Sequence, residues 1–148
     1  PNLREIQGDL RIEQNGDLSS LYMPKLEAIS GSLSIRDNKA LTYFDFPSLN
    51  TIGGTFYLQA NPDLENFDCP YLQTIGKDLL VQENTNLYYL SGLSGANIGR
   101  DLIVSLNDNL MDLPAGSIGR DAIVKYNENI DGASGLGIAM GGSFFFEP

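Results

Sequence analysis

A repeat of 23 residues runs along most of this 148-residue chain and leaves few folds open to it. Leucine, isoleucine and asparagine return at fixed places in the unit, which reads P-x-L-x-x-I-x-G-x-L-x-I-x-x-N-x-x-L-x-x-L. After Leu113 the unit becomes three residues shorter, so that IGRDLIVSLNDNL from Ile98 returns as IGRDAIVKYNENI from Ile118. One unit of this length is too short to bury its own apolar face, but stacked units bury a continuous core. The repeat therefore predicts a solenoid.

The segment L-x-I before each repeated asparagine alternates between inward and outward positions, as a short β-strand does. Equivalent strands of successive coils would pair in parallel, about 4.8 Å apart. We expect a mainly β fold, a right-handed parallel β-solenoid of about six coils of 23 residues with little or no α-helix. It would form a single domain over residues 1–148, either complete or as a fragment of, or repeat within, a longer surface protein.

An asparagine follows each of these predicted strands. We expect its side chain to turn inward at a bend, where the amide can bond to the backbone of the neighbouring coil. The asparagines of this structural ladder are Asn15, Asn38, Asn61, Asn84, Asn107 and Asn127.

Three stretches resemble known repeat families. The pattern L-x-I-x-x-N is similar to the core of leucine-rich repeats, and FPSLNTIGGTFYLQANPDL over residues 46–64 resembles the receptor L-domain repeat. GLSGANIGRDLIVSLNDNL over residues 92–110 resembles the related repeats of microbial surface proteins. The resemblance implies an extracellular or cell-surface localisation and a binding role, without naming a ligand. Receptor L domains usually carry disulfides, whereas Cys69 stands alone here and is expected to be a small buried side chain.

Composition excludes several classes of function. With 9 basic and 19 acidic residues, the net charge of −10 argues against nucleic acid and anionic membrane surfaces as partners, and we expect no membrane insertion. The chain has no histidine, so the commonest general base and transition-metal ligand is missing. We therefore expect no enzyme activity and no cofactor.

The central outward column of the predicted strands is apolar from the third coil onward. An exposed stripe of this kind marks a contact surface. Its partner would be a protein or a glycan at a surface, or a second copy of the chain, although a loop or another domain could also cover it. The stripe consists of Tyr57, Leu80, Ile103, Ile123 and Phe145.

A second outward column places three aspartates, Asp78, Asp101 and Asp121, one strand spacing apart. Stacked carboxylates would repel one another, and the basic residue that precedes each of them would relieve this. A solvated, charge-balanced rim is one interpretation. The alternatives are a Ca²⁺ site or the active site of a carbohydrate-active enzyme of the β-helix type.

The segment GSFFFEP closes the sequence. By the repeat register, Phe144 and Phe146 should turn into the core and Phe145 should extend the outward stripe.

Taken together, the repeat, the resemblance, the composition and the stripe lead to one functional hypothesis. We expect a non-enzymatic extracellular module with a structural or adhesive binding role, which could also assemble head to tail through its open ends.

Overall fold

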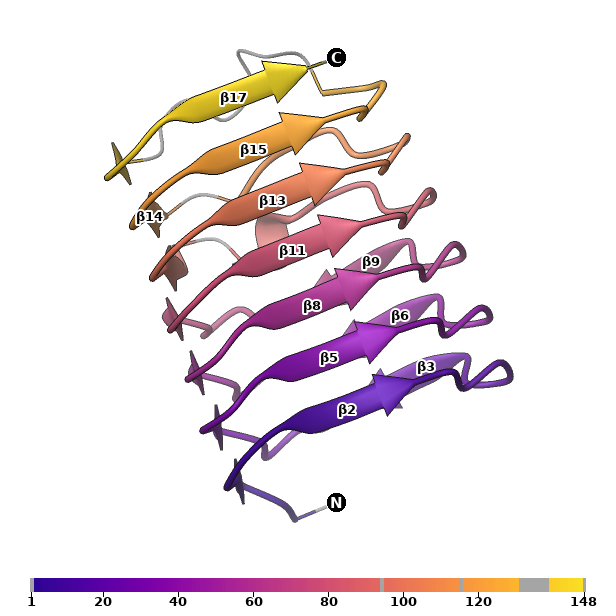
Figure 1. Cartoon of the computed structure of the whole chain (residues 1–148). Helices are drawn as coiled ribbons and strands as arrows, with labels where there is room; N and C mark the ends of the chain where they lie inside the picture. The colour runs from indigo at the N-terminus through magenta and orange to yellow at the C-terminus, as the bar shows by residue number, and fades with distance from the viewer. Residues whose placement is uncertain (1, 94, 115, 131–138, 148) are drawn as a thin grey trace.

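The computed structural model describes residues 2–93, 95–114, 116–130 and 139–147, and it is a parallel β-solenoid (Figure 1). Seven four-residue strands form the front sheet, in which every neighbouring pair is parallel. These strands are β2 (Leu10–Glu13), β5 (Leu33–Arg36), β8 (Phe56–Gln59), β11 (Leu79–Gln82), β13 (Leu102–Ser105), β15 (Ala122–Lys125) and β17 (Phe144–Glu147). The predicted mainly β solenoid is confirmed, with seven front strands separated by six steps of the repeat.

A second sheet, the side sheet, is built from two-residue strands that precede each front strand. Its repeated isoleucine points into the core and pairs with the isoleucine of the next coil, as Ile52 does with Ile75. The strands are β1 (Glu5–Ile6), β4 (Ala28–Ile29), β7 (Thr51–Ile52), β10 (Thr74–Ile75), β12 (Asn97–Ile98), β14 (Ser117–Ile118) and β16 (Ala139–Met140).

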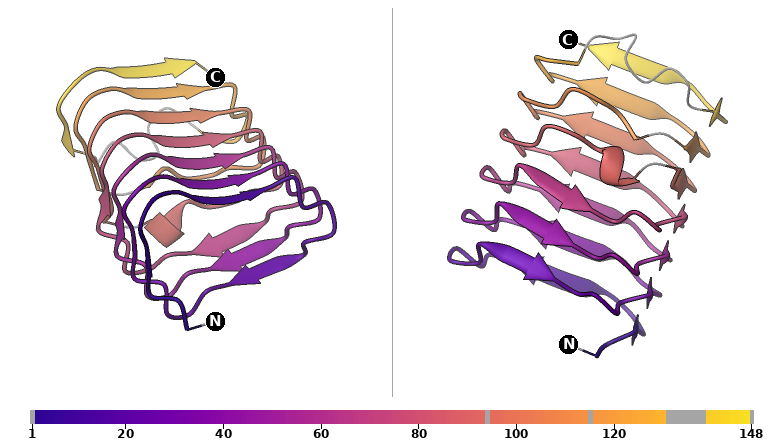
Figure 2. Two further views of the ribbon diagram at one scale, coloured as in Figure 1. Left: turned by 60° about the horizontal axis from the view of Figure 1, so that its bottom comes forward. Right: turned by 180° about the vertical axis from the view of Figure 1, so that it is seen from behind.

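The third sheet, the back sheet, lies on the side opposite the front sheet and occurs in the first three coils (Figure 2). Its strands are β3 (Ser20–Tyr22), β6 (Tyr43–Asp45) and β9 (Asn66–Asp68). The short 3-10 helix η1 (Ser91–Leu93) takes the corresponding place in the fourth coil and is the only helix among the described residues. No helix in that part of the chain is long and apolar enough to cross a membrane.

The core fills the space between the three sheets. Leucine, isoleucine and phenylalanine columns supply it, and members such as Ile35, Phe44 and Ile52 are completely buried. Cys69 belongs to this core and is 1% exposed, as predicted, and burial raises the pKa of its thiol.

The last front strand follows the register that the sequence predicts. Phe144 pairs with Ala122 and Phe146 with Val124, and both rings pack against the core. Phe145 pairs with Ile123 and is 52% exposed. The three consecutive phenylalanines therefore divide into two inward side chains and one outward side chain, as expected from the alternation of a strand.

The asparagine ladder lies at the corner between the front and back sheets. Asn38, Asn61, Asn84 and Asn107 are fully buried. The side-chain amide of Asn84 donates to the backbone carbonyl of Leu58 in the preceding coil at 2.9 Å and to that of Gln82 at 3.0 Å. Because the same bonds recur along the column, these side chains replace the backbone partners that the corner would otherwise lack.

Candidate binding face

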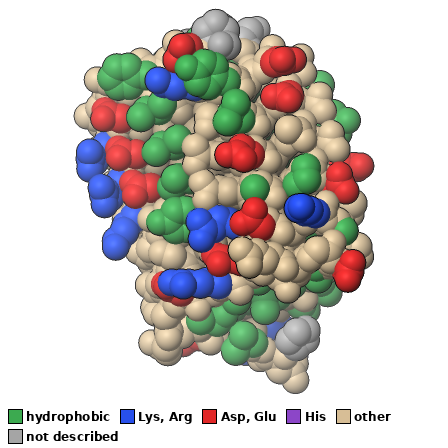
Figure 3. Space-filling view, turned by 45° about the vertical axis from the view of Figure 1, so that its right-hand side comes forward, with side chains coloured by type: hydrophobic (Ala, Val, Ile, Leu, Met, Phe, Trp, Pro, Cys, Tyr) green, Lys and Arg blue, Asp and Glu red, His purple; other side chains and the backbone are tan. Residues whose placement is uncertain are grey.

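The outward surface of the front sheet is divided into three parallel columns. The middle column carries the predicted apolar stripe, whose members are neighbours in the strand register: Tyr57 with Leu80, Leu80 with Ile103, Ile103 with Ile123, and Ile123 with Phe145. The first four are half-buried because each packs against the next, and Phe145 is exposed. In Figure 3 the stripe is visible as a row of hydrophobic side chains along the face of the sheet. The structure thus brings together all five predicted residues.

A polar column borders the stripe on the side of the asparagine ladder. Hydrogen bonds connect its central members: Arg36 donates to Gln59 at 3.4 Å, Gln59 donates to Gln82, and Gln82 donates to Ser105 at 2.8 Å. At its far end Lys125 forms an ion pair with Glu147 at 3.4 Å. These bonds hold extended side chains in fixed positions beside the stripe. The amides of this column also follow the 23-residue spacing, a signal in the sequence that could have identified it.

The aspartate column borders the stripe on the opposite side. A side-chain oxygen of Asp78 accepts the backbone N–H of Asp101 at 3.1 Å, and Asp101 accepts that of Asp121 at 3.1 Å. Asp121 in turn accepts the N–H of Ser143 at 2.9 Å. Each carboxylate therefore secures the start of the next front strand. At the beginning of the column, Asp9 accepts the backbone N–H of Ser32 in the same way, and the hydroxyl oxygen of Ser32 accepts that of Thr55.

Basic residues approach these carboxylates from the following coil. Arg100 lies 3.5 Å from Asp78, and Arg120 lies 3.4 Å from Asp101. The sequence suggested that the basic residue would relieve repulsion at the aspartate directly after it, whereas the contacts made run to the aspartate one coil earlier. Asp78 and Asp101 thus each receive a backbone donor and a guanidinium from the protein itself, whereas Asp121 receives the backbone N–H of Ser143.

Among the described residues, no group of three or more histidine, cysteine, aspartate or glutamate side chains is arranged to hold a metal ion. The aspartates Asp78, Asp101 and Asp121 remain the residues to which a calcium hypothesis would apply. Their geometry accounts for them as strand-start acceptors, and the expectation that no cofactor is needed stays a prediction.

At the N-terminal end of the face, the middle column changes character. Arg11 and Ser34 occupy it there in place of aliphatic side chains, and Glu13 lies in the neighbouring column. The pKa of Glu13 is lowered by the hydrogen bond that Ser34 donates and then by that of Arg36. The pKa of Asp9 is lowered by the backbone N–H of Ser32 and then by Arg11. The face therefore joins a charged end to an apolar remainder.

Comparison with protein families bears on what such a face does. The family model described as the receptor L domain matches residues 1–68. Neither the curated proteins nor the solved structures that were searched include a match. Receptor L domains are ligand-binding modules that are typically extracellular and not typically enzymatic. Residues 1–68 thus match the receptor L-domain family, as the repeat pattern predicted, and the same structural columns continue from there along the front sheet to Glu147.

Proposed function

We propose that this chain is a non-enzymatic extracellular binding module that contacts a protein partner through the apolar stripe of its front sheet. The observation that carries the proposal is the stripe itself, which runs unbroken over five strands from Tyr57 to Phe145. Soluble proteins rarely leave a contiguous apolar surface uncovered, and such surfaces serve as contact sites.

The borders of the stripe support a protein partner. Interfaces between proteins usually have an apolar centre enclosed by a polar rim that excludes water. Here the hydrogen-bonded polar column and the aspartate column supply that rim on the two sides of the stripe. The rim is held by contacts within the protein, so little side-chain entropy would be lost on binding. A structural or adhesive role would be one use of this surface, and assembly with further copies would be another.

We do not propose the carbohydrate-active enzyme as a second function. Its three aspartates each use one carboxylate oxygen on a backbone N–H of the next strand. That arrangement supports a structural use of the column.

The test compares the wild type with a double variant, Leu80→Asp and Ile103→Asp, in the middle of the stripe. The matched control carries Tyr22→Asp and Tyr71→Asp, which are 58% and 67% exposed and lie outside the front sheet. Each protein is immobilised and incubated with cell-surface proteins, and the retained proteins are quantified by mass spectrometry. Light scattering records self-association in parallel.

We expect the wild type and the control to retain the same partner, or to self-associate equally, and the stripe variant to do neither. Circular dichroism checks the fold of each variant. If aspartate disturbs folding, Leu80→Gln and Ile103→Gln replace it, because glutamine is accepted one column away at Gln59 and Gln82. Identical retention and self-association by all three proteins would exclude the stripe as the contact surface.

A further inference from the structure

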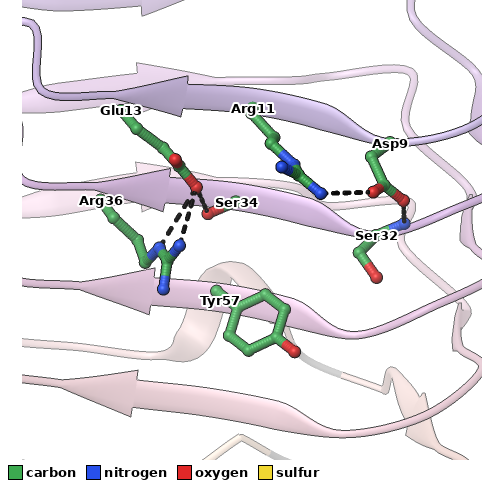
Figure 4. A pocket seen from close by; sticks show the side chains of 7 residues that line it. All are labelled: Asp9, Arg11, Glu13, Ser32, Ser34, Arg36 and Tyr57. Atoms are coloured by element: carbon green, nitrogen blue, oxygen red, sulfur yellow. Dashed lines mark hydrogen bonds and ion pairs between the residues drawn. The ribbon is translucent and has the colours of Figure 1, made fainter.

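A shallow pocket of about 380 Å³ opens on the front sheet at its N-terminal end, where the apolar stripe begins at Tyr57 (Figure 4). It exists because Ser34 stands between Arg11 and Tyr57 in the middle column, where later coils have Leu80 and Ile103. Arg11 and Tyr57 are two strand spacings apart, roughly 10 Å at the backbone. Ser34 is short and only 5% exposed, and Glu13 and Arg36 bond to each other beside it, so the pocket is a hollow above the serine and between the two longer side chains.

The charged groups around the pocket already neutralise one another. Arg11 pairs with Asp9 at 3.0 Å, and Arg36 bonds to Glu13 at 3.0 and 3.2 Å. Two guanidinium groups and two carboxylates give a local net charge of zero, so a bound molecule needs no charge of its own. The overall charge of −10 adds a repulsion that disfavours anionic molecules.

These groups keep hydrogen-bonding capacity after their internal bonds are made. Both contacts of Glu13 with Arg36, and its bond from Ser34, end on Oε1, so Oε2 can accept from a ligand. Arg11 uses Nη2 for Asp9, which leaves its other N–H groups as donors. The oxygen of Ser32 accepts the N–H of Thr55, and its hydroxyl proton is available to donate. Donors and acceptors therefore line the same small space, an arrangement that suits hydroxyl groups, which both donate and accept.

Tyr57 supplies one aromatic ring as a wall of the pocket (Figure 4). The Arg36 guanidinium carbon lies 5.5 Å from the ring centroid and helps to fix its orientation. The face of an aromatic ring carries partial negative charge and attracts polarised C–H groups. A single ring among polar side chains does not suit a lipid or a large apolar ligand, which would need a mostly apolar lining.

We infer that this pocket binds a neutral hexopyranose unit of a glycan, whose C–H face packs on Tyr57 while its hydroxyls bond to Arg11, Glu13 and Ser32. A sugar ring combines the three properties that the pocket selects: no net charge, a C–H face and hydroxyls around its edge. The pocket shares Tyr57 with the apolar stripe, but the inference does not depend on the proposed protein partner, because Leu80 and Ile103 do not line the pocket.

The experiment titrates the protein with methyl glycosides of glucose, galactose, mannose and N-acetylglucosamine, and follows the backbone amides by ¹⁵N NMR. Sodium glucuronate and glycine serve as charged probes. We expect at least one neutral glycoside to shift the amides of Ser32, Ser34 and Tyr57 in a saturable manner. The dissociation constant should lie in the millimolar range, as is usual for so small a ligand on an open site.

Two variants test the pocket itself. Ser34→Leu fills the gap and should abolish binding, and Tyr57→Leu removes the ring and should weaken binding about tenfold. Leucine occupies this column at Leu80, and circular dichroism checks the fold of both variants, because Ser34→Leu also removes the bond from Ser34 to Glu13. The control Tyr71→Leu removes an exposed tyrosine elsewhere and should bind as the wild type does. The variant Leu80→Asp with Ile103→Asp should also retain glycoside binding, even if it loses a protein partner.

The inference is overturned if no neutral glycoside shifts these amides, or if only glucuronate or glycine does. It is equally overturned if Ser34→Leu and Tyr57→Leu both bind the glycoside with the wild-type dissociation constant.

Discussion

The side-chain oxygen of Asn61 accepts two hydrogen bonds from Asn38, one from its backbone N–H at 3.2 Å and one from its side-chain amide at 3.3 Å. The side-chain amide of Asn61 donates in turn to the carbonyl of Ile35 at 3.0 Å and to Asn84 at 3.1 Å. One buried side chain therefore joins three successive coils. Because it uses both the oxygen and the NH₂ group, neither aspartate nor leucine can replace it.

Asn61→Asp should destabilise the protein strongly although it changes the shape of the side chain very little. The new carboxylate could still accept from Asn38, but it would lack the NH₂ group that donates to Ile35 and Asn84, and an oxygen would face the carbonyl of Ile35 in a fully buried position. We expect a loss of at least about 3 kcal/mol in the free energy of unfolding, measured with urea. The exposed Asn66→Asp is the control and should change it by less than about 0.5 kcal/mol. Equal losses in both variants would contradict a stabilising role of the buried asparagine ladder.

The side sheet brings backbones so close together that a side chain cannot fit at one column. A Cβ at Gly99 would overlap the carbonyl oxygen of Gly76, and one at Gly119 would overlap that of Gly99. Gly99→Ala should therefore cost about 2 kcal/mol or more, because the backbone of a paired strand has to move. Gly16→Ala is the matched control, since a Cβ there would meet no atom within 4 Å. A control variant as unstable as Gly99→Ala would contradict the close-approach argument.

The residue before each ladder asparagine adopts a left-handed backbone conformation. Leu106 has a φ of 59°, and Ala60 has a φ of 54°. A non-glycine residue loses about 1–2 kcal/mol of stability when it adopts this conformation. Glycine avoids that strain, but its greater freedom in the unfolded chain lowers the free energy of unfolding by about 0.4–1 kcal/mol. Leu106→Gly should thus raise the free energy of unfolding by up to about 1 kcal/mol. Leu106 is 45% exposed, so little packing is lost.

Leu106→Ala separates conformation from side-chain contacts, because alanine keeps the strain and removes the same contacts. We expect it to be less stable than Leu106→Gly in thermal unfolding. The reverse order would show that the left-handed conformation is not strained at this corner.

The sequence predicted most of the fold because residue type at each place in the repeat identifies its structural column. Leucine and isoleucine alternate into the core, and a constant spacing fixes the parallel register, so that even Phe144 and Phe146 were placed correctly. The back sheet was less predictable. Its three-residue strands depend on how the corners close, and η1 replaces a strand in the fourth coil.

The candidate site could be predicted only in part. The stripe from Tyr57 to Phe145 follows directly from alternation. The pocket does not, because it depends on the short Ser34 between two longer side chains, on an ion pair within the first coil and on another between the first and second coils. The bonds of the aspartate column were also missed, since a repeated carboxylate in a sequence gives no sign that its partner is a backbone N–H.

Asp101 allows the structural and calcium hypotheses to be separated. Asp101→Ala removes the acceptor for the N–H of Asp121, whereas Asp101→Asn keeps an oxygen in that place. We expect the free energy of unfolding of the alanine variant to be about 1 kcal/mol lower than that of the asparagine variant. Millimolar CaCl₂ should leave the melting temperature of the wild type unchanged. A rise with CaCl₂ that Asp101→Asn abolishes would instead support a calcium site, because a ligand of the folded state stabilises it.

Asp45 gives a prediction for pH dependence. It is the register partner of Asp68 on the back sheet, and burial, followed by the charge of Asp68, raises its pKa. The folded protein then binds this proton at a higher pH than the unfolded chain does, so ionised Asp45 lowers stability at neutral pH. The cost begins to disappear as the pH falls through the raised pKa, and it is absent below the unfolded value of about 3.9. Asp45→Asn should therefore be more stable than the wild type at pH 7, with a difference that shrinks toward zero at pH values below about 3.9. Urea unfolding of both proteins across this range measures the difference, and an advantage that stayed constant with pH would show that the charge of Asp45 is not its cause.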